Sequence, residues 1–388
     1  FRGSPERGSA DSKSRKPFRC DKSMKIALLG TRGVPNTYGG FEQFAEYLSV
    51  GLVKRGHDVT VYNPHNHSYK ETHLHDVTIQ RIFDPEKTVG TAGQFVYDFL
   101  SILNTHGKNF DIILQLGYTS SSLFFNFHPG NALIVTNMDG LEWKRSKYNQ
   151  RTQQFLKFAE KLAVRKSHHL IADSLGIQDY LQETYGAESY FLPYGATLFD
   201  KANEHAIQSY GLSAYGYNMV LARLEPENNI EIILQGHANS AHDLPLIVIG
   251  NHETTYGRYL VDEFSSAPQI RFLGAIYDLD MLNNLRHFSR LYFHGHSVGG
   301  TNPSLLEAMA SDALICAHDN IFNRSILSGD AFYFIGADDI AKLSDLTKSD
   351  HADKLANNRA KIKTLYDWDV VIDSYEAYLQ GLLHPAQS

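Results

Sequence analysis

MKIALLGTRGVPNTYGGFEQFAEYLSVGLVKRGHDVTVYN, residues 24–63, contains four segments of different character. Its first seven residues form a short apolar run that ends in Gly, which is typical of a buried parallel strand. A loop rich in Gly and Pro follows at 31–40, and residues 41–57 have the apolar spacing of an amphipathic helix. Residues 58–63 predict a second strand. A strand, a loop, a helix and a strand form a βαβ unit, so this stretch predicts a parallel sheet.

The same alternation of strands and helices continues along the chain and then restarts after a polar stretch at 197–216. We therefore predict two successive Rossmann-like α/β domains, at 24–197 and 198–366, which face a central cleft, followed by a final segment at 367–388. The further strands are expected at 110–117, 132–140, 168–174, 189–196, 218–223, 244–251, 270–275, 290–296 and 313–318, and helices at 151–167, 175–186 and 228–239.

The composition is that of an ordinary globular protein, with 388 residues, 43% hydrophobic and 20% charged. A net charge of −7 argues against nucleic acid as a partner, because nucleic-acid binders usually carry a basic surplus. Residues 1–23 are polar and lack the apolar centre of a signal peptide, so we expect a disordered leader or a remnant of cloning.

The chain has two cysteines, Cys20 and Cys316. Cys20 falls in the expected leader, and one remaining thiol cannot form an internal disulfide. We therefore expect a reducing, cytoplasmic location. The residues around Cys316 have the pattern of a buried strand end, which favours packing over catalysis.

Ligands of open α/β sheets bind outside the carboxyl ends of the strands, so the loops there are the first places to look for a site. The loop at 30–40 has neither the GxGxxG nor the GK[ST] pattern, and the next strand ends in Asn63 rather than an acid, so NAD binding is not expected. Gly39 and Gly40 directly precede a helix, where free N–H groups and the helix dipole attract anions. A simple tight turn is the alternative.

Two further strand ends carry charged side chains. Asp139 lies at the carboxyl end of the strand expected at 132–140, although Asp-Gly is also an ordinary turn sequence. Arg223 ends the strand expected at 218–223, and its planar, permanently charged guanidinium suits a diphosphate. The alternative for Arg223 is a surface salt bridge to Glu225 or Glu227.

The stretch HGHSVGGTNPSLLEAM, residues 294–309, predicts a strand end, a glycine loop and a helix. Asn302 is a good N-cap and Pro303 suits the first helical position, so the helix is expected to start at about 303. Gly299 and Gly300 let the backbone approach a ligand closely. Glu307, one turn into the helix, can accept hydrogen bonds from a ribose diol. The alternative is that Glu307 only complements the helix dipole.

Together these motifs resemble the retaining GT-B glycosyltransferases of family four, and most closely their bacterial rhamnosyltransferase-like subgroup. The resemblance covers about 24–380. It rests on TRGVPNTYGGFEQ, NMDGLEWKR, ARLEPENN, HGHSVGGTNPSLLEAM and the closing YDWDVVIDSYEAYL, which in the family forms a helix that crosses back to the first domain.

The resemblance implies a role for each matching position. Gly39, Gly40, Gly299, Gly300, Thr301 and Asn302 would lie near the donor diphosphate with Arg223 and Asn228, Asp139 near the reacting sugar, Glu307 on the nucleotide ribose, and the backbone of Ile276 on the base. Two positions depart from the family pattern. Gly299 replaces the first Glu of the paired-Glu motif, and Asn228 replaces a Lys, so the identity of the donor sugar stays open.

The resemblance implies a metal-independent reaction without a cofactor. The acids at 278–280 and 367–369 fit helix surfaces rather than a metal site, and the spacing of the histidines at 65–75 fits no standard metal site. Residues 144–166 carry eight Lys and Arg against a single acid, Glu160. This stretch is either a solvated helix face or a peripheral contact with an anionic membrane.

The expected function is transfer of a sugar, with rhamnose as the leading candidate, in bacterial surface polysaccharide synthesis. The donor would be a dTDP-, UDP- or GDP-linked sugar and the acceptor a glycan or lipid-linked precursor at the inner membrane face. A sugar-nucleotide epimerase on the same fold and a non-catalytic nucleotide-sugar or glycan binder remain alternatives.

Overall fold

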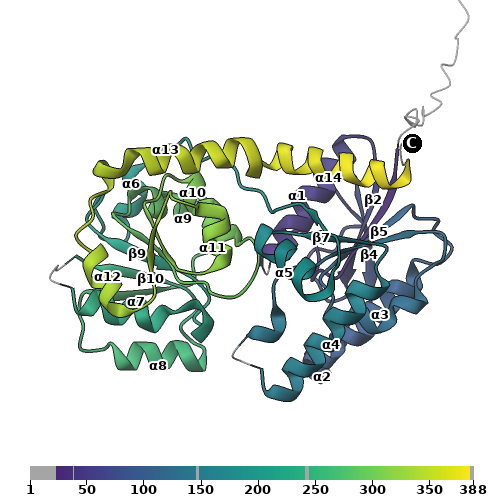
Figure 1. Ribbon diagram of the computed structural model, residues 1–388, viewed down its shortest axis with the longest axis horizontal. Helices are drawn as coiled ribbons and strands as arrows, with labels where there is room; N and C mark the ends of the chain where they lie inside the picture. Colours follow the sequence, from purple (N-terminus) through teal and green to yellow (C-terminus); the bar gives the residue numbers. More distant parts are fainter. Residues whose placement is uncertain (1–22, 38, 146–147, 241–243, 385–388) are drawn as a thin grey trace, which may run out of the picture.

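A computed structural model of the protein describes residues 23–37, 39–145, 148–240 and 244–384 (Figure 1). Two sheets organise this part of the chain. The first has the strand order β3-β4-β2-β1-β5-β6-β7-β8 and is parallel except for the β3–β4 pair. Its strands are β1 (Lys25–Leu29), β2 (Asp58–Pro64), β3 (His73–Leu74), β4 (Val77–Ile82), β5 (Ile112–Leu116), β6 (Leu133–Asn137), β7 (His169–Ala172) and β8 (Tyr190–Phe191).

The second sheet has the order β11-β10-β9-β12-β13-β14, and all its pairs are parallel. This is the doubly wound order, which reverses direction between the first strand, β9, and the fourth, β12. The strands are β9 (Asn218–Leu221), β10 (Leu246–Ile249), β11 (Ile270–Gly274), β12 (Tyr292–His294), β13 (Ile315–His318) and β14 (Phe332–Phe334).

Helices cover both sheets. With the first lie α1 (Gly40–Lys54), α2 (Glu86–Val89), η1 (Gly90–Ala92), α3 (Gly93–Asn104), η2 (Ser121–Phe127), η3 (Glu142–Lys144), α4 (Gln150–Lys166) and α5 (Leu175–Tyr185). The second half of the chain contains α6 (Glu204–Gln208), η4 (Pro226–Asn228), α7 (Ile230–Ala238), α8 (Thr255–Glu263), α9 (Leu279–Phe288), α10 (Pro303–Ala310), α11 (Ile321–Leu327), α12 (Ala337–Leu343), η5 (Lys348–His351), α13 (Ala352–Lys361), η6 (Ile362–Tyr366) and α14 (Trp368–Leu383).

The expected βαβ start is confirmed. β1 pairs with β2 on one side and β5 on the other, and its residues from Ile26 onward are buried, as expected for a strand covered on both faces. On α1, Phe44, Ala45, Leu48 and Leu52 are fully buried, because residues at spacings of three and four share one helix face.

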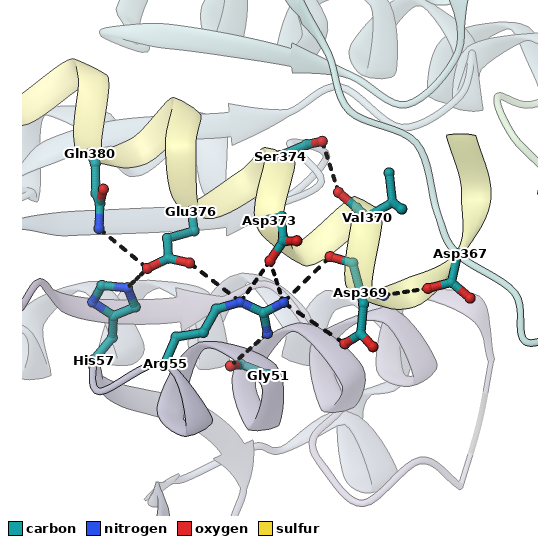
Figure 2. A network of polar contacts seen from close by, with 10 residues as sticks. All are labelled: Gly51, Arg55, His57, Asp367, Asp369, Val370, Asp373, Ser374, Glu376 and Gln380. Carbon is teal, nitrogen blue, oxygen red and sulfur yellow. Dashed lines mark hydrogen bonds and ion pairs between the residues drawn. The ribbon is translucent and has the colours of Figure 1, made fainter. Parts of the chain in front are cut away.

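The closing helix packs on the first half of the chain. α14 continues α13 across the molecule and lies against α1 (Figure 1). Arg55 at the end of α1 pairs with Asp373 and Glu376, and His57 Nε2 lies 2.8 Å from Glu376 Oε1 (Figure 2). Gly51 is needed here, because a Cβ on it would lie 2.4 Å from Ile372 Cδ1.

Several features differ from the sequence predictions. The stretch 189–196 forms only the two-residue strand β8, since Pro193 lacks the N–H that would continue the ladder. β4, α3 and β14 were not predicted. Cys316 is fully buried in β13, as expected. Cys20 and residues 1–22 of the expected leader lie outside the described residues, as does Lys147 of the basic stretch.

Candidate functional site

Two helix N-termini meet where the two halves of the chain face each other. Gly40 is the first residue of α1 and Pro303 is the first residue of α10. A Cβ on Gly40 would lie 3.1 Å from the Cγ atom of Pro303. The Asn302 side chain caps α10 by accepting the Ser304 N–H at 2.9 Å, as predicted. Because the first N–H groups of a helix lack intrahelical acceptors, the junction concentrates donors and positive dipole ends. This arrangement suits an anion.

The loop before α1 is fixed by its own helix. Gly30 has φ +85°, and a Cβ there would meet the Leu116 carbonyl oxygen at 2.3 Å, so the loop crosses directly over the end of β5. The buried Glu42 accepts the Arg32 N–H at 2.9 Å through Oε1. These contacts place Gly39 and Gly40 at the reversal point between β1 and β5, the usual ligand position of such a sheet.

Asp139 and Asp173 form a carboxyl pair at the ends of β6 and β7. The fully buried Asp173 accepts the Thr301 N–H at 2.9 Å through Oδ2, and its carbonyl oxygen accepts the Thr301 hydroxyl. Asp139 lies beside Asp173 and Tyr194. Burial raises the pKa of Asp139 to about 6, with a smaller contribution from the charge of Glu142. Burial and the neighbouring Asp139 raise the pKa of Asp173 well above its usual range.

The glycines of the 299–301 loop are explained by this contact. A Cβ on Gly300 would lie 1.9 Å from Asp173 Oδ1, so no side chain fits there. A Cβ on Gly140 would lie 3.2 Å from the Gly299 Cα, and Gly299 has φ +127°. Gly299, Gly300, Thr301 and Asp139 therefore belong to one contact between the halves of the chain. Asp173 was missed, although it lies at the carboxyl end of a predicted strand just as Asp139 does.

We expect the stability of the protein to fall as the pH rises from about 4 to above 6. Carboxyl groups whose pKa is raised by folding bind more protons in the folded than in the unfolded state, so stability decreases with pH across that interval. For Asp139 the contribution is complete below its ordinary value of 3.8 and lost as the pH passes about 6. Urea unfolding measured across this range is expected to show a shallower slope for Asp139→Asn.

The control for this pH prediction is Asp338→Asn, which changes an exposed acid in the first turn of α12. It is expected to leave the slope of stability against pH unchanged. An Asp139→Asn slope equal to that of the wild type would contradict the assignment of the raised pKa to this pair.

Arg223 lies at the end of β9 with an exposed side chain. Among the described residues its guanidinium forms no hydrogen bond or ion pair. The alternative prediction was a surface salt bridge from Arg223 to Glu225 or Glu227. These two carboxylates lie 3.8 and 4.0 Å from Arg145, which belongs to the first half of the chain. The buried Asn228 donates through Nδ2 to the Arg223 carbonyl oxygen at 2.7 Å, which fixes the loop that carries Arg223.

His294 and His296 were not assigned a role from the sequence. Their rings stack with centroids 4.4 Å apart at the end of β12, beside the reversal point that carries Arg223. Burial lowers the pKa of His296 to about 3, with smaller contributions from Arg223 and Arg145, and lowers that of His294 well below its usual range. Both imidazoles are therefore neutral at pH 7. The feature that could have revealed them is their alternation on one strand, His-Gly-His.

A cavity of about 300 Å³ lies between the two halves and contains Glu307. Glu307 Oε1 accepts from Gln43 Nε2 of α1 at 3.3 Å, and Oε2 pairs with Arg286 at 2.5 Å. Arg286 and Gln43 were not predicted. The cavity is lined by Gln43, Tyr47, Gly195, Ala196, Thr197, Leu198, Phe199, Leu279, Asp280, Asn283, Glu307 and Trp368.

The predicted residues thus fall into three places. Gly39, Gly40, Asp139 and the loop from Gly299 to Asn302 meet between the halves, and Glu307 lines the adjoining cavity. Arg223 and Asn228 lie at the end of β9. Ile276 follows β11, two strands away from β9 in the sheet order, is half-buried against the core, and is not part of the cavity wall.

Comparison with known proteins identifies the fold. A family model described as "Domain of unknown function (DUF1972)" matches residues 23–197. Sucrose-phosphate synthase from Thermosynechococcus elongatus superimposes with a TM-score of 0.75 at 15% identity, over 92% of this chain and 98% of that one. The chain has the GT-B fold. The predicted fold class, two Rossmann-like parallel sheets that face each other, is therefore confirmed.

Two further structures share this GT-B architecture. HepE from Anabaena, in complex with UDP-glucose, gives a TM-score of 0.72 at 16% identity, over 92% of this chain and 98% of that one. The α,α-trehalose 6-phosphate synthase of Burkholderia multivorans gives 0.68 at 13% identity, over 93% and 97%. A search of the curated proteins finds no match. At these identities the likeness is one of fold.

Proposed function

We propose that the protein is a retaining glycosyltransferase that moves a sugar from a nucleotide-diphosphate donor to a glycan or a lipid-linked acceptor. The observation that carries the proposal is the meeting of the α1 and α10 N-termini between two GT-B sheets, with Arg223 exposed at the reversal point of the second sheet. Convergent N–H donors and a cation without a protein partner in the described residues fit a diphosphate.

In this proposal the diphosphate takes the backbone N–H groups of Gly40, Gly299, Gly300 and Asn302, because the N–H groups of Gly39 and Thr301 already donate to Asn36 and Asp173. The Arg223 guanidinium approaches the diphosphate oxygens. Glu307, already oriented by Arg286, accepts the ribose hydroxyls in exchange for its contact with Gln43. Negative charge grows on the leaving diphosphate as the sugar bond breaks. Donors that are fixed in advance around that charge lower the barrier without having to reorganise.

We propose that retention arises from a front-face displacement. Asp139, the carboxyl group expected near the sugar, has a raised pKa and lies beside another carboxyl group, so it is a poor covalent nucleophile. The bond between the anomeric carbon and the diphosphate oxygen breaks, and the acceptor oxygen bonds to the same carbon on the same face. The acceptor proton passes to the departing phosphate oxygen. In this proposal Asp139 holds the sugar hydroxyls by hydrogen bonds, and the fully buried Asp173 lies behind it.

The donor and the acceptor are proposed as chemical classes rather than as single compounds. HepE is described with UDP and UDP-glucose, and for this chain we propose a dTDP-, UDP- or GDP-linked donor, with rhamnose as the leading sugar by motif resemblance. Surface polysaccharide synthesis supplies acceptors of the right chemistry. We propose that no metal takes part, as the resemblance of the motifs implies.

A thermal-shift screen tests the donor. We expect one nucleoside diphosphate among UDP, GDP and dTDP, and its sugar, to raise the melting temperature in the presence of EDTA. A ligand that binds only the folded state at about 100 times its Kd stabilises it by about 2.7 kcal/mol.

The outcomes separate the alternatives. Transfer to an acceptor fraction supports the proposal. Conversion of the donor sugar without any acceptor would identify an epimerase, and binding without turnover would identify a non-catalytic nucleotide-sugar binder. A screen in which none of the nucleotides shifts the melting temperature would remove the proposed site.

A further inference from the structure

One face of the first half of the chain exposes apolar side chains from three neighbouring elements, α3, η2 and α4. We call it the α3–η2–α4 face and define it by Val96, Leu103, Leu123, Phe127 and Phe158, each exposed by 39–52%. α4 and α3 lie side by side in Figure 1, and η2 contacts both. Single exposed apolar residues are ordinary, but a group on adjoining elements indicates an interaction surface.

Ring contacts between neighbouring aromatic residues link the three elements that carry this face. Phe99 of α3 lies 5.0 Å from Phe124 and 5.3 Å from Phe127 of η2, measured between ring centroids. Phe95 of α3 lies 5.8 Å from Phe155 of α4. Phe155 is one helical turn from Phe158, so the aromatic surface extends along α4.

The charges on this face are of one sign. The exposed charged residues of α4 are all basic, namely Arg151, Lys157, Lys161, Arg165 and Lys166. The acid of α4, Glu160, is buried and accepts hydrogen bonds from the hydroxyls of Tyr118, Tyr180 and Tyr185, so it does not reach the surface. The acid of α3, Asp98, is also buried, and η2 carries no charge.

The basic and apolar side chains share one side of α4. Arg151, Phe158, Lys161 and Arg165 are separated by seven, three and four residues, which places them on the same helical face. Leu156, Ala159 and Ala163 are buried on the opposite side. Arg151, Lys161 and Arg165 form no hydrogen bond or ion pair with other described residues, so their charges are not neutralised within this part of the fold.

We propose that the α3–η2–α4 face docks on the surface of an anionic phospholipid bilayer. Exposed Phe and Leu side chains enter the headgroup–acyl boundary, while Lys and Arg meet the phosphates. None of the helices described is long and apolar enough to cross a bilayer, so the contact is peripheral. A net charge of −7 means that the attraction is local to this face and orients the protein.

The position of the face suits a lipid-borne acceptor, in a step that rests on the proposed function. η3, which begins three residues after Asp139, contacts α4. Docking through α4 would therefore hold the cleft beside the membrane. The docking surface itself does not depend on the protein being a glycosyltransferase.

Co-sedimentation with vesicles of phosphatidylcholine, with and without phosphatidylglycerol, tests the proposal on the full chain. We expect binding only to the vesicles that contain phosphatidylglycerol, and weaker binding at high salt. The triple variant Arg151→Gln, Lys161→Gln, Arg165→Gln is expected to lose affinity on the order of 100-fold, because each basic residue near the surface contributes about fivefold. Phe158→Ser with Leu123→Ser is expected to lose at least about tenfold.

The matched control is Lys201→Gln, Lys342→Gln, Lys363→Gln, which removes the same number of exposed charges away from this face. It is expected to bind like the wild type. Equal loss in the control would show that net charge alone drives binding. No binding by the wild type, or unchanged binding by the α4 triple variant, would overturn the proposal, as would self-association that the two serine substitutions abolish while vesicle binding persists. Nucleotide-induced melting shifts in the same variants report separately on the cleft.

Discussion

Replacing Glu307 with Ala is expected to lower the free energy of unfolding by about 3–5 kcal/mol, because it leaves a buried charge without its partner. The charge is that of Arg286, whose residue is fully buried and whose Nη2 lies 2.5 Å from Glu307 Oε2. The other partners of the guanidinium are Asn283 Oδ1 at 2.7 Å and Ser304 Oγ at 3.3 Å, and both are neutral. Neither can balance the charge, so the folded state bears the cost.

Urea unfolding measures this effect, and two companion variants identify its cause. Glu307→Gln keeps an acceptor of similar size and is expected to lose less stability than the Ala variant. Arg286→Met together with Glu307→Ala removes both charges and is expected to recover much of the loss. A Glu307→Ala protein that unfolds like the wild type would show that Arg286 does not depend on this carboxylate.

A variant of Glu307 can also separate the role of this residue in folding from its role in nucleotide binding. Glu307→Gln is the variant suited to calorimetry with a nucleotide, because more of its fold is retained. Loss of a charged hydrogen-bond acceptor is expected to weaken binding by about 1.5–3 kcal/mol. Unchanged nucleotide affinity in a folded Glu307→Gln protein would leave Glu307 with a purely structural role.

Replacing Arg223 with Ala is expected to lower kcat by about 100- to 1,000-fold, the range seen when one fixed donor to a developing negative charge is removed. Arg223 extends into solvent without a partner among the described residues, so its removal leaves no buried charge and the fold should persist. Because charge on the diphosphate grows in the transition state, kcat is expected to fall more than KM rises. Steady-state kinetics with the donor found by thermal shift measure both constants.

Arg223→Lys sharpens the test. Lys keeps the charge but loses the planar two-donor fork, so we expect activity between those of the wild type and the Ala variant. Arg258→Lys, a change at an exposed Arg of α8, serves as the control and is expected to be silent. Sugar transfer at the wild-type rate by Arg223→Ala would place the diphosphate elsewhere.

The sequence predicted what depends on local pattern. Strand ends located Asp139, Arg223 and the loop before α10, because hydrophobic periodicity and capping residues are local signals. α3 escaped prediction because its apolar residues do not form one stripe: Tyr97 and Ile102 are buried, whereas Val96 and Leu103 face outward.

The rest of the site depends on how the two halves dock, which no local pattern encodes. Gln43 meets Glu307 across 264 residues, and Thr301 meets Asp173 across 128. The sequence pattern predicts that Arg286 lies on the polar face of an amphipathic helix. The packing of α9 on α10 buries it instead. The need for Gly300 is likewise visible only once Asp173 lies against it.

The closing helix has a consequence for motion. The chain passes between the two sheets twice, and at the crossing the Ala196 N–H donates to the Tyr366 carbonyl oxygen at 2.7 Å. Since α14 is bound to α1 beyond this point, both connections leave the first sheet from one spot. Two tethers held together restrict sliding and make the crossing a pivot. We therefore expect the cleft to open by a swing about this crossing, widest at the edge farthest from it.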